Sequence, residues 1–247
     1  MEFPQSVDAR DSAPGVSRAG APETGKHGRR EQEGLWREVL SLAAYVESAL
    51  KSAVEALSDP RPDLIAAVKA DEDEIDRWEV RIESECLRVL ALYDLVASDL
   101  RRVVAALRVN RDLEGIADLA ENLAKRARKL NKDPLASSYL PRLRALAEES
   151  LGVVKESLSA LRSMDADLAR RVILADNSVD RNRVLIVEEL KQAIRDRPER
   201  VNTWLRLINS ARNLERAADH ATNLAEAVVY VKEGLFVRRG ATGLSDD

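Results

Sequence analysis

Hydrophobic residues recur every three or four positions along most of the chain, which is the spacing of one face of an α-helix. The pattern begins near Leu35 and is interrupted at five short segments, three of which contain Pro. It predicts six helices, at residues 35–57, 63–92, 97–129, 140–162, 167–195 and 201–232. Runs of alternating β-branched residues are absent, and strong helix formers dominate the composition. The sequence therefore predicts an all-α fold.

The six predicted helices form two sets of three that are similar in sequence. The segment LEGIADLAENLA at residues 113–124 matches LERAADHATNLA at residues 214–225 at eight of twelve positions. Further upstream, matched residues such as Asp76 and Asp180 are separated by a constant 104 positions. Because self-similarity of this kind indicates duplication, we predict two tandem homologous three-helix bundles. They are expected at residues 34–132 and 136–236.

The two ends of the chain differ from this helical region. Residues 1–33 mix Pro, Gly, Ser and Arg with almost no bulky apolar groups. Such a segment cannot bury enough surface to order itself, so we expect a disordered N-terminal tail. Residues 237–247 are expected to be a loose C-terminus.

Charge and composition exclude several classes of protein. The 247 residues carry a net charge of −4 with both signs interspersed, whereas a dedicated nucleic-acid binder carries a basic excess. No apolar stretch is long enough for a transmembrane helix, and the N-terminus lacks the pattern of a signal peptide. The single cysteine, Cys86, excludes an internal disulfide and suits a reducing compartment. We therefore expect a cytoplasmic protein that binds no nucleic acid.

Acidic residues occur in pairs, one helical turn apart, on the apolar faces of four predicted helices. The pairs are Glu72/Asp76, Glu114/Asp118, Asp176/Asp180 and Glu215/Asp219. Paired carboxylates repel each other when ionised, and partial burial increases the cost. Hard divalent or trivalent cations would neutralise them, and so would Arg side chains from neighbouring helices. Since four pairs repeat in register, we favour metal binding for the set, with Fe, Zn, Mn and Mg all compatible.

The acidic motifs also carry a resemblance to a known family. Residues 214–226, with the shorter partner at 113–124, resemble the Glu/Asp-x-x-x-Asp signature of the PhoU family. Residues 97–101 and 229–234 are similar to segments that flank this signature in the family. The resemblance covers residues 35–238 and implies two three-helix bundles with multinuclear metal clusters on the eight acids above. In the first signature, Gly115 and Leu119 stand where the family has Arg and His.

The same resemblance implies a function. PhoU-like proteins regulate phosphate uptake and phosphate homeostasis, and they repress the phosphate-starvation (Pho) response. The implied partners are the ATPase of the Pst phosphate ABC transporter and a PhoR-type histidine kinase, with membrane association only through the transporter. A homodimer is also compatible with the sequence. No Gly-rich phosphate loop, Ser-His-Asp set or His-rich motif is present, so we expect no catalytic residues and no enzymatic activity.

Two alternatives remain open. A carboxylate-bridged di-metal oxidase would also place acids on facing helices, but such sites use Glu-x-x-His, and no Glu here has His three residues later. A metal-free helical scaffold is the other alternative. His220 falls about 140° around its helix from Glu215, so we expect it to point away from the acidic face. Cys86 shares a face with Ile75, Ile82 and Val89, which predicts a core position.

Overall fold

The computed structural model describes residues 21–237, without the side chains of residues 21–27 and 176. This range contains six long helices and one short 3-10 turn, with no strand, which confirms the predicted all-α fold. The elements are α1 (Ala21–Ser58), α2 (Pro62–Leu92), α3 (Ala97–Leu130), α4 (Leu140–Ser163), α5 (Ala166–Asp196), η1 (Pro198–Arg200) and α6 (Val201–Glu233). Within residues 21–237, no helix combines the length and the apolar character that crossing a membrane requires.

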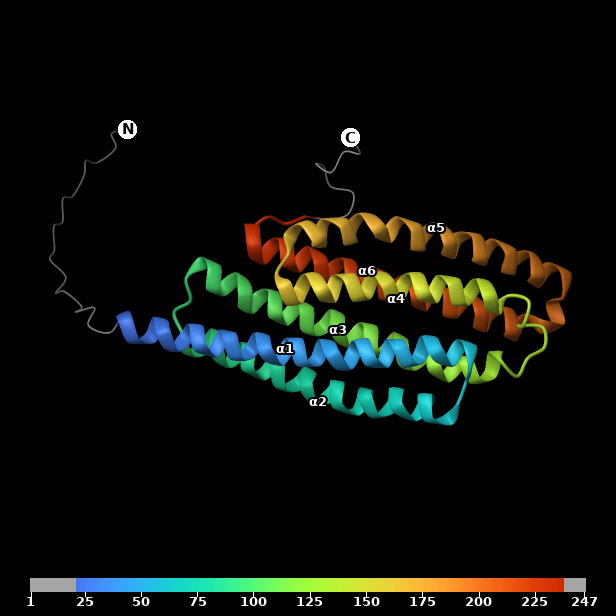
Figure 1. Cartoon of the computed structure of the whole chain (residues 1–247), viewed down its shortest axis with the longest axis horizontal. Coiled ribbons are helices and arrows are strands. Elements are labelled where there is room, and N and C mark those ends of the chain that lie inside the picture. Colours follow the sequence, from blue (N-terminus) through green and yellow to red (C-terminus); the bar gives the residue numbers. More distant parts are fainter. Residues whose placement is uncertain (1–20, 238–247) are drawn as a thin grey trace, which may run out of the picture.

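The helices form two three-helix bundles that lie side by side (Figure 1). Helices α1, α2 and α3 make the first bundle, and α4, α5 and α6 make the second. Helix α3 packs along α6, and α1 packs along α4, so each bundle presents two helices to the other. The outer helices, α2 and α5, lie on opposite sides of the molecule. The predicted architecture of two tandem bundles is thus confirmed.

Local sequence explains where the helices begin and end. Pro62 occupies the first turn of α2, where the missing backbone N–H costs nothing. The Asp165 side chain caps α5 by accepting hydrogen bonds from the backbone N–H groups of Asp167 and Leu168, at 3.0 and 2.9 Å. Gly234 ends α6 with a φ of +73°, a left-handed conformation that glycine adopts without steric cost. These signals fix the lengths of the helices on which the acidic pairs lie.

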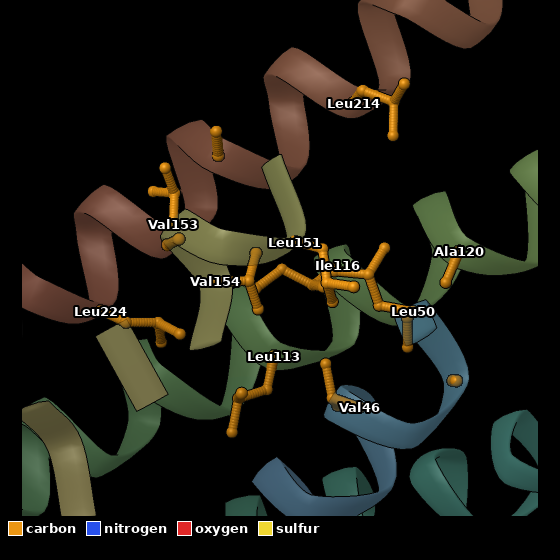
Figure 2. Packing of buried hydrophobic residues seen from close by; sticks show 14 of the residues in the cluster. Val46, Leu50, Leu113, Ile116, Ala120, Leu151, Val153, Val154, Leu214 and Leu224 are labelled. Atoms are coloured by element: carbon orange, nitrogen blue, oxygen red, sulfur yellow. The ribbon is translucent and has the colours of Figure 1, made fainter. Parts of the chain in front are cut away.

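One continuous hydrophobic core runs through both bundles. Figure 2 shows its centre, where Leu50 of α1, Ile116 of α3 and Leu151 of α4 lie close together. Alanines are frequent along the buried faces of α3 and α6, and their small side chains let these two helices approach each other closely. The bundles therefore share a core, and neither has a separate one.

The predicted N-terminal boundary is wrong in one respect, because α1 begins at Ala21 and not near residue 34. Residues 21–33 contain few apolar side chains, so no hydrophobic periodicity indicates a helix there. Contacts with the far end of α2 support it: Glu31 pairs with Arg88 at 2.6 Å, Gln32 is buried, and Gly28 lies against the ring of Tyr93. The predicted disorder of residues 1–20 and the predicted loose segment at 238–247 fall outside the described residues.

Candidate functional site

In the first bundle, α2 and α3 bring four carboxylates together. We call Asp76, Glu79, Glu114 and Asp118 the first acidic cluster. Glu114 is half-buried on α3, and burial together with the charges of Asp118, Glu79 and Asp76 raises the pKa of its carboxyl. The nearby imidazole of His220 opposes this shift. Three of the four acids were expected here from the sequence.

Glu79 is the member that sequence reasoning missed. Burial raises the pKa of its carboxyl, and the charges of Glu83, Asp76 and Asp118 raise it further. The spacing in the sequence could have identified Glu79, because it follows Glu72 by seven residues and therefore lies on the same side of α2 two turns later. The prediction was confined to acidic pairs that repeat in both bundles, and Glu79 has no acidic counterpart in the second, where residue 183 is Arg.

Glu72, by contrast, belongs to a separate pair. It shares a hydrogen bond with Glu121 of α3, which is itself ion-paired with Lys125. Burial, the hydrogen bond with Glu121 and the charge of Glu121 raise the pKa of Glu72 to about 7. Burial also acts to raise the pKa of Glu121, but the hydrogen bonds with Lys125 and Glu72 outweigh it and lower that pKa. The two carboxyls therefore share a proton near neutral pH.

This shared proton predicts a pH dependence of stability. The pKa of Glu72 in the folded protein lies above its ordinary value of 4.5, so its contribution to stability is complete at low pH and is lost as the pH rises through about 7. We expect the free energy of unfolding to fall by about 1–3 kcal/mol between about pH 5 and about pH 8, since a pKa change of one is worth about 1.4 kcal/mol and solvent screening reduces the full value at this partly exposed pair. Glu72→Gln should flatten this profile, because the amide keeps the hydrogen bond to Glu121 without titrating. Urea unfolding at several pH values measures both profiles, and equal slopes in the two proteins would contradict the assignment.

In the second bundle, an arginine lies among the acids. Arg183 of α5 places its Nη2 atom 3.2 Å from Oδ1 of Asp180 and 3.4 Å from Oε1 of Glu215. We call Asp180, Glu215, Asp219 and Arg183 the second acidic cluster. Burial and the charge of Asp219 raise the pKa of Glu215, and the guanidinium of Arg183 opposes this rise. Asp176 lies one turn before Asp180 on α5, and its side chain is not among those described.

His220 of α6 lies near Glu114 of the first acidic cluster and bridges the two bundles. Its Nδ1 atom lies 2.9 Å from Oδ1 of Asp112 on α3, and the amide of Asn223 donates to the same oxygen at 3.0 Å. The imidazole lies directly against Gly115: a Cβ atom on this glycine would come within 2.7 Å of the ring. A side chain at residue 115, such as the Arg of the family pattern, would therefore require the ring to move.

The chemistry of the two clusters differs with respect to metal ions. Within the part of the chain whose side chains are described, no three His, Cys, Asp or Glu side chains converge as a metal site. The first acidic cluster consists of carboxylates alone, which is a donor set suited to hard cations. The second contains a cationic side chain bonded to two of its acids. Metal binding by the eight predicted residues stays a prediction.

Cys86 lies in the hydrophobic core, which confirms the predicted position. The side chain is fully buried, and burial raises the pKa of the thiol to about 12. The thiolate that nucleophilic chemistry needs is therefore strongly disfavoured.

Comparison with known proteins matches both bundles to one family. The family model described as PhoU domain matches residues 39–127 and 143–228. A phosphate-specific transport system accessory protein PhoU homolog of Pseudomonas aeruginosa is 34% identical over 218 residues, covering 88% of this chain and 90% of that protein. The homolog of Aquifex aeolicus is 34% identical over 209 residues, covering 85% of this chain and 94% of that protein.

Solved structures agree with this match. The crystal structure of PhoU from Pseudomonas aeruginosa has a TM-score of 0.77 at 33% identity, covering 84% of this chain and 99% of that one. The phosphate transport system regulatory protein PhoU from Streptococcus pneumoniae has a TM-score of 0.76 at 25% identity, covering 85% and 99%. Two matched domains, one on each bundle, and relatives aligned over almost their whole length show that the chain belongs to the PhoU family.

Proposed function

We propose that this protein is a cytoplasmic accessory protein that regulates phosphate uptake and phosphate homeostasis. It would contact the ATPase of a Pst-type phosphate transporter and a PhoR-type histidine kinase, and repress the phosphate-starvation response. One observation carries the proposal: the PhoU domain match covers both bundles, and the relatives that align over about nine-tenths of their length are named accessory proteins of phosphate-specific transport.

The proposal is one of action through binding. The described side chains of the two acidic clusters are carboxylates and one guanidinium. His220, the one His among the described side chains, is hydrogen-bonded to Asp112, and Cys86 is buried in the core. The alternative of a di-metal oxidase gains no support from this arrangement, since His220 contacts neither cluster through a hydrogen bond or ion pair.

We also propose that the first acidic cluster binds a metal ion. Asp76, Glu79, Glu114 and Asp118 would hold it through carboxylate oxygens, with Mn, Mg, Fe or Zn as candidates. When bound, the cation supplies positive charge that removes the repulsion among these acids. The repulsion itself supports the proposal, because each of three neighbouring carboxylates raises the pKa of Glu114.

Deletion of the gene tests the proposed function. We expect the deletion strain to express phosphate-starvation genes in phosphate-rich medium, with altered phosphate uptake, and we expect a plasmid copy to restore both. A tagged protein should recover a transporter ATPase or a sensor kinase from cells. Unchanged uptake and unchanged starvation-gene expression in the deletion strain would contradict the proposal.

A homodimer is part of the same proposal. Several large apolar side chains are exposed along α2 and could form the dimer interface. Among them, Val80 is 66% exposed and Leu87 is 57% exposed. Light scattering that gives a mass near 27.4 kDa would show a monomer under the conditions used.

A further inference from the structure

Arg183 holds, in the second bundle, the position that Glu79 holds in the first. The two residues are 104 positions apart, which is the offset that relates Asp76 to Asp180. Both follow their Asp by three residues, so both lie beside it on the same face of the helix. Glu79 adds a carboxylate to its cluster, whereas Arg183 adds a guanidinium. The two homologous bundles therefore differ in the sign of one charge at the centre of the site.

The geometry shows what this charge does. Nη2 of Arg183 lies within 3.4 Å of acids on two helices, Asp180 on α5 and Glu215 on α6. The side chains of Arg183, Asp180 and Glu215 are only 26%, 35% and 19% exposed, so salt screens these pairs less than it screens surface pairs. A planar guanidinium with five N–H donors can serve several carboxylate oxygens at once. Arg183 thus neutralises acids that would otherwise repel across the α5–α6 interface.

We infer that Arg183 is a resident counter-ion that takes the place of a metal ion in the second bundle, so that the two bundles of this protein are not equivalent in cation binding. A metal ion at Asp180 and Glu215 would have to displace a guanidinium bonded to both, against the repulsion between like charges. The second cluster therefore does not fit the metal implied by the family resemblance. The inference concerns the second bundle only and goes beyond the proposed function.

Removing the acids distinguishes a resident counter-ion from a metal site. We expect Glu215→Gln combined with Asp219→Asn to lower the melting temperature in EDTA by about 2–8 °C, because the partly buried Arg183 loses the charge of its partner Glu215. The response of this variant to Mn²⁺ should equal that of the wild type. A metal site predicts the reverse, since removing unneutralised acids raises the melting temperature in EDTA and abolishes any stabilisation by Mn²⁺ at this bundle.

Changing the arginine tests the same inference from the other side. Arg183→Glu makes the second cluster match the first, so it should melt at a lower temperature than the wild type in EDTA and should bind more Mn²⁺ per chain after desalting. Arg181→Glu is the matched control, because Arg181 is exposed two residues away and undergoes the same charge change. The inference is overturned if the double acid variant melts higher in EDTA or loses a Mn²⁺ response that the wild type has. It is also overturned if Arg183→Glu binds no more Mn²⁺ than Arg181→Glu. None of these measurements depends on phosphate uptake, so the proposed function stands or fails separately.

Discussion

Replacing Ile116 with alanine is expected to lower the free energy of unfolding by about 2–5 kcal/mol. Ile116 is completely buried on α3, at the centre of the core that the two bundles share (Figure 2). The substitution removes apolar contacts and leaves a cavity that well-packed neighbours on α1 and α4 fill only in part. Because the core is continuous, both bundles should lose stability together.

Urea unfolding followed by helical circular dichroism measures this loss. We expect a single cooperative transition whose midpoint moves to lower urea while its slope stays the same. Val96→Ala is the control, since its side chain is 60% exposed and its substitution should change stability by less than about 0.5 kcal/mol. Two separate transitions, with only one moved by Ile116→Ala, would show that the bundles unfold independently.

Removal of metal from the first acidic cluster should lower the free energy of unfolding by an amount similar to that of Ile116→Ala. If the first acidic cluster binds a cation, Mn²⁺ at 100 times its dissociation constant should stabilise the fold by about 2.7 kcal/mol, and EDTA should remove this gain. Glu114→Gln combined with Asp118→Asn should abolish the response to Mn²⁺. In EDTA the same variant should be at least as stable as the wild type, because burial and the neighbouring acids make ionised Glu114 costly.

Chemical denaturation of the wild type and of the double variant, each with Mn²⁺ and with EDTA, gives the four free energies of unfolding that the comparison needs. Asp73→Asn serves as control, since Asp73 is an exposed carboxylate on α2 outside the cluster. A wild type that is equally stable with Mn²⁺ and with EDTA would refute metal binding by the first acidic cluster.

Sequence periodicity was sufficient to predict the six helices and the two bundles, because each helix carries a regular apolar face. It failed before residue 34, where α1 is extended by contacts such as Glu31 with Arg88 that leave no periodic trace. Helix geometry also predicted on which face of its helix each acidic pair lies. It could not predict which acids of α2 contact which acids of α3, because that depends on how the two helices are aligned.

The acidic residues illustrate this limit. Glu72 and Glu79 lie on one side of α2, but only Glu79 reaches Glu114, while Glu72 meets Glu121. The repeat offset could have identified Arg183 as the counterpart of Glu79, because the comparison needs only the sequence. Its hydrogen bonds to two helices required the packed structure.

The contact between Gly115 and His220 couples two positions that lie in different halves of the duplicated chain. With the imidazole held by Asp112, even a methyl group at residue 115 would come within 2.7 Å of the ring. A side chain at residue 115 therefore requires the ring of His220 to shift, and a shift would disturb its contact with Asp112. The two halves of this duplicated protein have thus ceased to vary independently at this point, although each retains its own copy of the acidic signature.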